Sequence, residues 1–438
     1  MRVLLVAWAF PPSRASGVHR AVAIARWLAA RGHSVTVLSA DREFFELGTG
    51  VDAELERRLP QGVTTARVTF PMAEDPIVNR WPALRANDRR RWAADAEESS
   101  RAFFPEKHYG GWRDRLVGSA IRLHRQNSFH LTIATGNPYV SFAASLALNT
   151  HAGVPFVMDD RDSFLYWVYT GEPQPEFDRR RSWWEALASR CVAAWFVNPP
   201  IAELYRRDYP DLASRILVVE NGWDPEYLDP STLATPSSDP PIFGYVGTLN
   251  ALFPLEHLLR GWRGARGRTI PADSELRVYG GLGYRHQAAP QREQLRQAAA
   301  EGVRIMGAFP RVDASNAYEQ SQVLVFGCGG GSLMTASKVY EYVATGLPIA
   351  AVVPDDHDSL RILAGYPRAH IRPSADEAAW PEALASALAD ARSTSIAGLG
   401  AARAYGQRFR RDVMLDGPLG DAVSTASQAR DSAGRPPN

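Results

Sequence analysis

Short apolar runs alternate with amphipathic stretches along most of the chain. The first apolar run covers residues 2–8, and an amphipathic stretch at 18–31 and a second apolar run at 35–38 follow it. Uninterrupted apolar runs of this length are typical of strands that are buried on both faces of a parallel sheet and connected by helices. These three segments therefore predict a β-α-β unit with a right-handed crossover.

The same alternation recurs in both halves of the chain. In the first half it predicts further strands at 131–134, 155–158, 192–198 and 216–219, whereas the stretch 41–110 is less regular and is interpreted as excursions and helices. In the second half it predicts strands at 242–246, 276–279, 303–306, 323–326 and 349–353. Strands that alternate with helices in this way predict an α/β fold with two doubly wound, Rossmann-like domains.

The length of the chain, 438 residues, suits two domains of roughly 200 residues each. A Pro/Ser/Thr-rich segment at 229–241 is typical of a linker, and the turn residues Asn221 and Gly222 mark the boundary shortly before it. The expected division is a first domain at 1–228, a linker at 229–241, a second domain at 242–396, a last helical segment at 397–423 and a polar, disordered tail at 424–438.

Composition narrows the class of protein. An apolar content of 45% and a charged content of 22% are typical of a globular protein, and a net charge of +1 gives no overall attraction to nucleic acid. The two cysteines, Cys191 and Cys328, lie far apart in the sequence, so no disulfide framework is expected and a reducing cytoplasm is the default location. No uncharged apolar run reaches 18 residues, so no transmembrane helix is expected.

The most informative stretch covers residues 336–349. It follows a predicted strand and a loop with glycines at 327, 329, 330 and 331. A helix that begins after such a loop presents backbone N–H groups and the positive end of its dipole to an anion. Lys338, one of only two lysines beside 47 arginines, adds a charge in the first turn, and Glu341 lies on the same helix face. We therefore expect a site for a phosphate joined to a sugar; a buried helix with a solvated Lys–Glu pair is the alternative.

This stretch resembles the nucleotide-sugar site of family 4 of the retaining GT-B glycosyltransferases, and most of all the subgroup that acts on bacterial envelope polysaccharides and lipid-linked sugars. The subgroup's pattern reads roughly Ser-Lys-x-x-Glu-Tyr-x-Ala-x-Gly-x-Pro. The residues that match it are Ser337, Lys338, Glu341, Tyr342, Ala344, Gly346 and Pro348. Segments 31–37, 155–162 and 220–224 resemble other parts of the same family. The resemblance implies a GT-B fold whose two domains face a central cleft, with segment 397–423 crossing back to the first domain.

The resemblance also implies a reaction. A sugar would pass from a nucleoside diphosphate to a polysaccharide, a glycolipid or a secondary metabolite, with retention of configuration and with neither a metal nor a cofactor. Ser337 and Lys338 would stabilise the leaving diphosphate, and Glu341 would hold hydroxyls of the ribose. The donor-binding set is then Gly247, Thr248, Gly280, Gly307, Gly330, Gly331, Ser337, Lys338 and Glu341.

A second group of candidates follows predicted strands in the first domain, since ligands bind at the carboxyl ends of strands in open parallel sheets. The acceptor-side set is Ser16, Gly17, Asn137, Arg161 and Asp162, and Asp162 joins Lys338 and Glu341 as a catalytic candidate. A helix cap and a surface ion pair are the alternative for Arg161 and Asp162. For the Trp- and Arg-rich segment 164–184, three interpretations stay open: core packing, a lid on the acceptor, or peripheral contact with an anionic membrane.

Two departures from the family pattern keep other functions open. Leu333 stands where many members have a first glutamate, and no cation follows Gly247 before Arg260. One alternative is a sugar-nucleotide epimerase or a cyclitol-coupling relative, although Leu333 and the glycine run argue against it. The other is a degenerate protein that binds a nucleotide sugar or acts as a scaffold, against which the retained Ser337, Lys338 and Glu341 argue. The base, the sugar, the acceptor, the linkage and the oligomeric state are left open.

Overall fold

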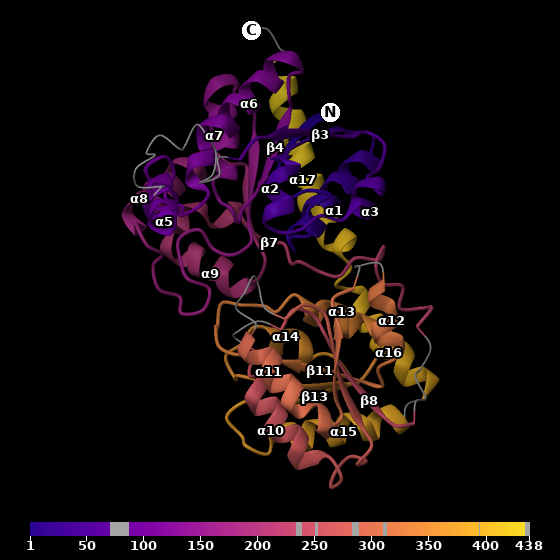
Figure 1. Ribbon diagram of the computed structural model, residues 1–438. Coiled ribbons are helices and arrows are strands. Elements are labelled where there is room, and N and C mark those ends of the chain that lie inside the picture. Colours follow the sequence, from indigo (N-terminus) through magenta and orange to yellow (C-terminus); the bar gives the residue numbers. More distant parts are fainter. Residues whose placement is uncertain are drawn as a thin grey trace. The chain divides into compact units, whose positions relative to one another are not determined.

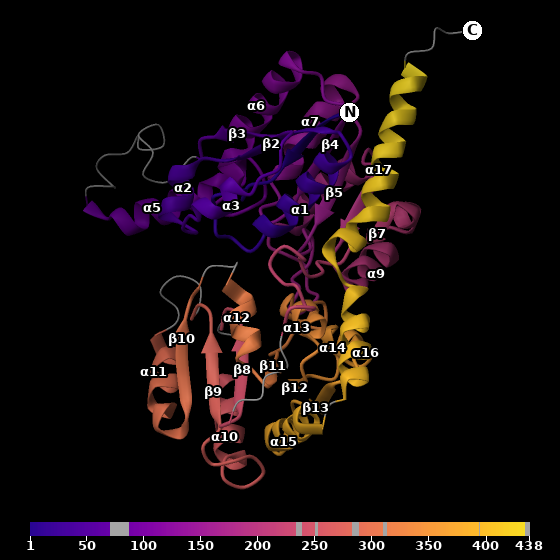
Figure 2. The same ribbon diagram turned by 90° about the vertical axis from the view of Figure 1, so that its right-hand side faces the viewer.

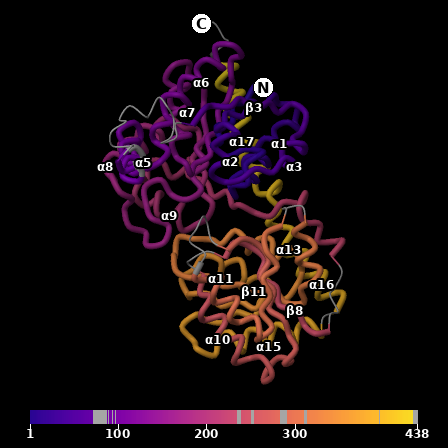
Figure 3. Tube along the Cα trace, viewed as in Figure 1, coloured from indigo at the N-terminus to yellow at the C-terminus, as the bar shows by residue number. Residues whose placement is uncertain are grey.

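The computed structural model describes residues 1–70, 87–233, 239–249, 253–282, 289–309, 313–393 and 395–433. The chain forms two compact units (Figure 1). Unit 1 consists of Met1–Val168, Glu172–Glu220 and Leu415–Asn438, and unit 2 consists of Tyr169–Gly171 and Asn221–Met414. Unit 1 is therefore assembled from the indigo-to-magenta start of the chain and its yellow end, as the trace in Figure 3 shows.

Unit 1 is built on a seven-stranded parallel sheet in the order β3-β2-β1-β4-β5-β6-β7, so the strand order reverses between β1 and β4. The strands are β1 (Arg2–Val6), β2 (Ser34–Ala40), β3 (Val63–Val68), β4 (Leu131–Thr135), β5 (Phe156–Asp160), β6 (Ala193–Phe196) and β7 (Ile216–Val218). The described helices are α1 (Val18–Ala30), α2 (Arg42–Leu47), α3 (Ala53–Arg57), α5 (Arg89–Ser99), α6 (Arg113–Gln126), α7 (Ser141–Ala152), α8 (Phe177–Ala188), α9 (Pro199–Asp208) and α17 (Arg411–Ala433), which begins in unit 2.

Strand β3 lies inside the stretch 41–110, where the sequence predicted only excursions and helices. Among the described strands it pairs with β2 alone, at the edge of the sheet, and five of its six residues are partly or fully exposed. An edge strand of this kind alternates small, polar and charged residues and carries no apolar run, so the periodicity that revealed the other strands was missing. Part of the same stretch, residues 71–86, lies outside the described residues.

Unit 2 is built on a six-stranded parallel sheet in the order β10-β9-β8-β11-β12-β13, which Figure 2 shows from β10 on the left to β13 on the right. The strands are β8 (Ile242–Val246), β9 (Glu275–Tyr279), β10 (Val303–Gly307), β11 (Val323–Gly327), β12 (Ile349–Val353) and β13 (Ala369–Pro373). The described helices are α10 (Leu255–Ala265), α11 (Ala289–Gln297), α12 (Ala314–Glu319), α13 (Lys338–Thr345), α14 (Ser359–Leu363), α15 (Ala379–Ser393) and α16 (Ile396–Gln407).

The core of unit 2 has one hydrophobic cluster on each face of its sheet. Leu324 and Phe326 of β11 pack with residues of α13, whereas Val323 and Val325 pack with residues of α10 and α15. Successive residues of a strand point to opposite faces, so an uninterrupted apolar strand fills both clusters. This arrangement explains why the central strands could be predicted from apolar runs.

The C-terminal segment differs from its prediction. Two helices, α16 and α17, replace the single segment at 397–423, and residues 424–433 are helical rather than a disordered tail. The reason is a buried apolar face on α17, formed at helical spacing by Leu415, Leu419, Ala422 and Ala426. Helix α17, yellow in Figure 2, joins unit 1 through a hydrogen bond of 2.8 Å from Trp27 Nε1 to Asp416 Oδ1. Residues 434–438 lie outside the described part.

The predicted linker at 229–241 is also placed differently. The chain passes from unit 1 to unit 2 at Glu220, and Leu228 and Leu233 are already buried in the core of unit 2. Burial of these two apolar side chains orders this part of the chain, although the composition around it is rich in Pro, Ser and Thr. Residues 234–238 lie outside the described residues. Arg411, buried in unit 2, donates to the carbonyl oxygens of Asn221 and Gly222 and contacts Asp224.

The Trp- and Arg-rich segment 164–184 packs mainly into unit 1. Trp184 is fully buried, whereas Arg179 and Arg181 are exposed. Trp167 and Tyr169, each 43% exposed, are the aromatic side chains of the segment that reach solvent most. Among the described residues, no helix combines the length and the apolarity that crossing a bilayer requires.

Candidate functional site

Helix α13 begins directly after the loop that follows β11, with Ser337 as its N-terminal cap residue. It ends at Gly346, whose φ of +82° is in the left-handed region that favours glycine. Tyr342, on its buried face, ties the helix to β8: the N–H of Val246 donates to the Tyr342 hydroxyl at 2.7 Å. The middle of α13 is thereby fixed beside the carboxyl end of β8.

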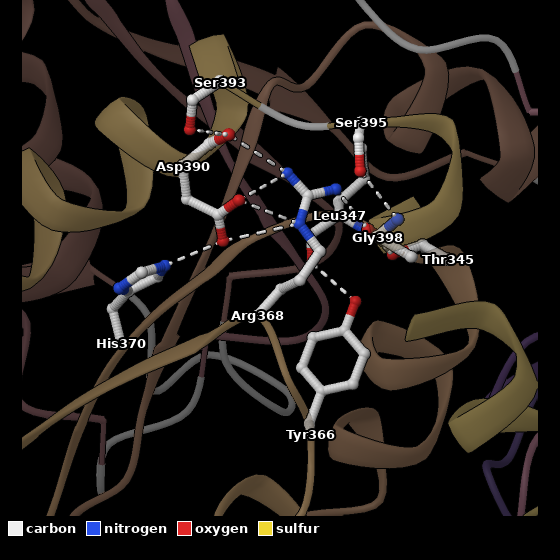
Figure 4. A network of polar contacts seen from close by, with 10 residues as sticks. Thr345, Leu347, Tyr366, Arg368, His370, Asp390, Ser393, Ser395 and Gly398 are labelled. Atoms are coloured by element: carbon white, nitrogen blue, oxygen red, sulfur yellow. Dashed lines mark hydrogen bonds and ion pairs between the residues drawn. The ribbon is translucent and has the colours of Figure 1, made fainter. Parts of the chain in front are cut away.

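A polar network holds the other end of α13 (Figure 4). The buried guanidinium of Arg368 donates to the carbonyl oxygen of Gly346 at 2.7 Å, and the Tyr366 hydroxyl donates to that of Leu347 at 2.8 Å. Asp390 accepts from Arg368 at 3.0 Å and lies 2.9 Å from Nε2 of His370. These two carbonyl groups directly follow α13, so the network restrains the chain where the helix ends, and Nε of Arg403 donates to the carbonyl oxygen of Thr345, the last residue of α13, at 3.3 Å.

Lys338 and Glu341 form the centre of the candidate site. The ammonium of Lys338 lies 2.7 Å from Oε2 of Glu341, and the hydroxyl of Tyr318, on α12, donates to the same oxygen at 2.8 Å. The side chain of Glu341 is 9% exposed and that of Lys338 is 28% exposed. The cation therefore lies nearer to solvent, and the carboxylate lies behind it.

Three strand ends meet beside this pair. Gly247 follows β8, Gly280 follows β9 and Gly307 ends β10; the N–H of Gly280 donates to the carbonyl of Gly307 at 2.8 Å. A Cβ atom on Gly280, where φ is +121°, would lie 2.3 Å from the carbonyl oxygen of Gly247. A Cβ atom on Gly247 would lie 3.4 Å from Cγ of Lys338. The structure thus brings together five of the predicted donor-side residues: Gly247, Gly280, Gly307, Lys338 and Glu341.

The remaining donor-side candidates lie around this group. Thr248 follows Gly247 and approaches Gly281, and Ser337 is exposed at the start of α13. Gly330 and Gly331 have φ values of +46° and +104° in the loop before α13, and no described atom lies within 4 Å of a Cβ built on Gly330. That loop follows β11, which neighbours β8 where the strand order of the sheet reverses. Open parallel sheets bind ligands at such a position.

In unit 1, the predicted acceptor-side residues gather at the carboxyl ends of β1, β4 and β5. A Cβ atom on Gly17 would lie 2.7 Å from Nη1 of Arg161, whose Nη2 donates to the carbonyls of Gly136 and Asn137 at 2.8 and 3.0 Å. Nδ2 of Asn137 donates to Oδ2 of Asp162 at 2.7 Å. Ser16 is exposed beside Gly17, and no contact with the others is described for its side chain.

Two buried carboxyl groups under this edge were not singled out in the sequence. Glu106 accepts from the backbone N–H groups of Tyr139 and Val140, just before α7, and burial raises its pKa to about 7. Asp160 accepts from the N–H of Phe164 at 3.0 Å, and burial, followed by the nearby Asp162, raises its pKa to about 7. Glu106 lies 33 residues before the turn that it holds, so no local pattern could have revealed it.

A buried ion pair lies at the same edge. Asp159 accepts from Nη2 of Arg20 at 2.7 Å and from Nε at 2.9 Å, and both side chains are almost completely buried. Arg20 also donates to the carbonyl oxygen of Glu220, the last residue of unit 1 before the chain enters unit 2. This pair joins α1 to β5 behind Arg161 and Asp162.

No protein-family model and no curated protein matches this sequence. Solved structures do match over nearly the whole chain. A glycosyltransferase from Rickettsia africae is 13% identical, with a TM-score of 0.64 over 97% of this chain and 98% of its own. HepE from Anabaena, solved in complex with UDP, is 12% identical, with a TM-score of 0.62 over 97% of this chain and 100% of its own.

An α,α-trehalose 6-phosphate synthase from Burkholderia multivorans is 14% identical, with a TM-score of 0.61 over 100% of this chain and 99% of its own. Identities this low establish the fold alone. They agree with the two parallel sheets, and the predicted fold class is confirmed. The chain has the two-domain, Rossmann-like α/β fold of the GT-B glycosyltransferases.

Proposed function

We propose that this protein is a glycosyltransferase that moves a sugar from a nucleoside diphosphate to an acceptor. One observation carries the proposal: a lysine and a glutamate share one face of α13, where the strand order of the sheet in unit 2 reverses. A cation beside a helix N-terminus suits a diphosphate, and a carboxylate suits the hydroxyls of a ribose. The glycosyltransferase from Rickettsia africae and the UDP complex of HepE support this chemistry and make UDP the first nucleotide to test.

The proposed chemistry assigns a role to each group. The ammonium of Lys338 and the N–H groups at the start of α13, next to Ser337, stabilise the negative charge that develops on the leaving diphosphate. Glu341 accepts from the ribose. The sugar is transferred with retention, and an oxygen of the leaving phosphate takes the proton of the acceptor on the same face. This mechanism needs no metal and no nucleophile from the protein.

The acceptor side is proposed to lie at the edge formed by Gly17, Asn137, Arg161 and Asp162. The hydrogen bond from Asn137 to Asp162 orients the carboxylate, which is partly exposed and suited to accept from an acceptor hydroxyl. A cytoplasmic location is proposed as well, since Cys191 and Cys328 are both free and buried. Contact with a membrane surface stays a proposal that binding to anionic vesicles at low salt would test.

A second candidate is a protein that binds a nucleotide sugar without transferring it. The bond between Lys338 and Glu341 favours it, because the cation that would bind the diphosphate is already paired with a carboxylate. The two candidates differ in products. Sugar transfer or slow hydrolysis of the donor supports the enzyme, whereas tight binding with neither supports the binding protein. Conversion of the donor into an epimer would support the epimerase alternative.

The first experiment measures thermal stabilisation by UDP-, GDP-, dTDP- and CMP-sugars. A ligand at 100 times its Kd adds about 2.7 kcal/mol to the free energy of unfolding. We expect one nucleotide class to stabilise the wild type and the Lys107→Ala variant, but not Lys338→Ala. Lys107 is a matched control because it is the only other lysine and is 44% exposed beside Glu98. Equal stabilisation of both variants would contradict the proposed donor site.

A further inference from the structure

Tyr318 contacts the candidate site from a different element. It lies on the short helix α12, is completely buried, and packs edge-on against Tyr342 with ring centroids 6.2 Å apart. Its hydroxyl donates to Oε2 of Glu341 at 2.8 Å. The two residues are 23 positions apart, and a further bond, from Val246 to Tyr342, holds α13 next to β8. Tyr318 is therefore held in place by the same packing that positions α13.

Glu341 receives two donors on one oxygen. Oε2 accepts from Tyr318 at 2.8 Å and from Lys338 at 2.7 Å. A buried carboxylate that loses a donor is strongly destabilised, because hydrogen bonds to charged groups are stronger than those between neutral groups and the buried charge has no water to replace the lost donor. If Tyr318 did not donate as well, moving Lys338 away from Glu341 would leave Oε2 without either donor. The tyrosine hydroxyl lowers the cost, since it stays with the carboxylate while the ammonium moves.

The two donors differ in their freedom to move. Lys338 has a flexible stem and a side chain that is 28% exposed, and its stem passes over Gly247, which offers no side chain to hold it. Tyr318 has a rigid ring that is enclosed by the core. The lysine is therefore the partner that can be exchanged, and the tyrosine is the partner that stays.

We propose that Tyr318 is a positioning residue: it fixes the carboxylate of Glu341 toward the ribose and lets Lys338 transfer its bond from Glu341 to the diphosphate. This inference rests on the proposed function. The inference adds an exchange of partners to the proposed function. Lys338 is bound to Glu341 when the nucleotide is absent and to phosphate oxygens when the nucleotide is bound. The hydroxyl of Tyr318 stays bonded to Glu341 in both states.

The test is Tyr318→Phe, which removes the hydroxyl and keeps the ring. Calorimetry would measure the Kd of UDP, ADP and GDP, and then of the 2′-deoxy and 3′-deoxy forms of the one that binds most tightly. We expect the variant to bind that nucleotide about tenfold more weakly, as the loss of one charge-assisted hydrogen bond implies. We also expect it to lose most of the preference for ribose, since the carboxylate is no longer held in one orientation.

Two comparisons separate positioning from general loss of structure. In a Glu341→Gln background, Tyr318→Phe should have no further effect on ribose preference, because Tyr318 acts through Glu341. Tyr366→Phe is the matched control: Tyr366 is also buried in unit 2, but its hydroxyl donates to the carbonyl oxygen of Leu347 at the far end of α13. It should lower the melting temperature and leave ribose preference unchanged.

The outcomes are distinct. A wild type that binds none of these nucleotides, and neither dTDP nor CMP, would overturn the proposed function and this inference together. A wild type that binds, with Tyr318→Phe unchanged in Kd and ribose preference, would overturn the inference alone, as would an equal loss of preference in Tyr366→Phe. If Tyr318→Phe does not fold, fluorotyrosine labelling of the wild type decides: the ¹⁹F signal of Tyr318 should shift when the nucleotide binds, and an unchanged signal would refute the exchange of partners.

Discussion

A Cβ atom on Gly280 would lie 2.3 Å from the carbonyl oxygen of Gly247. The two glycines directly follow the neighbouring strands β8 and β9, and the N–H of Gly247 donates to the carbonyl oxygen of Tyr279 at 2.9 Å. The backbone beside Lys338 is therefore packed so closely that one methyl group would displace it. Glycine at 280 is required by this approach as well as by its φ of +121°.

We expect Gly280→Ala to destabilise unit 2 by several kcal/mol and to abolish nucleotide binding. Gly267→Ala is the matched variant, because Gly267 lies in unit 2 outside the donor-binding set: its φ is +76°, but the added Cβ would lie 3.6 Å from Cβ of Ala272, an ordinary contact. It should cost only about 1–2 kcal/mol from backbone strain and retain binding. Denaturant unfolding and calorimetry would check both variants, and similar losses in the two would contradict the role of the close approach.

Lys338→Ala should lower turnover on the order of 10²-fold or more, because it removes the cation that stabilises the leaving diphosphate. Lys338→Arg keeps a positive charge but not the compact ammonium, so its turnover should fall between that of the wild type and that of Lys338→Ala. Initial rates of sugar transfer would measure this, with Lys107→Ala as the unchanged control. Full-rate turnover in Lys338→Ala would refute the assignment.

Asp160 should make unit 1 less stable as the pH rises. Its pKa is about 7 in the folded protein, against a value near 4 in the unfolded chain, so between these values only the folded state keeps the proton. The stabilisation that Asp160 contributes is complete below about pH 4 and decreases between about pH 4 and about pH 7. Above pH 7 it no longer changes, and the whole decrease is at most about 4 kcal/mol.

Asp160→Asn keeps an acceptor for the N–H of Phe164 and removes this titration. The variant should therefore gain stability relative to the wild type when both are moved from pH 5 to pH 8. Denaturant unfolding at the two pH values gives the difference in free energy of unfolding between the variant and the wild type. The contributions of the other carboxylates, including Glu106, are the same in both proteins and cancel in this difference. A constant difference between variant and wild type would show that Asp160 has an ordinary pKa.

Arg20→Met should destabilise unit 1 by about 3–5 kcal/mol, because it leaves the buried carboxylate of Asp159 without its counter-charge. Arg42→Met is the control, since Arg42 and Glu46 form an exposed pair on α2, which is worth at most about 1 kcal/mol. Replacing both partners, with Arg20→Met and Asp159→Leu, should recover much of the loss. Equal effects of the two single variants would contradict the importance of burial.

The sequence predicted those features that depend on neighbours along the chain. Central strands are apolar on both faces, and a helix places Lys338 and Glu341 on one face by spacing alone. Features that depend on packing between distant segments were missed. Tyr318 lies in an ordinary short helix, and Glu106 supports a turn 33 residues later, so neither is marked by a local pattern. The prediction of a disordered C-terminal tail was wrong because the polar composition of 424–438 obscured that the apolar face of α17 continues into it at Ala426.

The return of α17 to unit 1 has a consequence for the order in which the protein matures. Unit 2 is one nearly continuous stretch of chain inserted into unit 1, whose final helix is the last described element to be synthesised. During synthesis, domains fold as their residues emerge, at about 5–20 residues per second. All residues of unit 2, up to Met414, are made before Leu415, Leu419, Ala422 and Ala426, whose side chains complete the core of unit 1. The half of the molecule that is made first is therefore completed last.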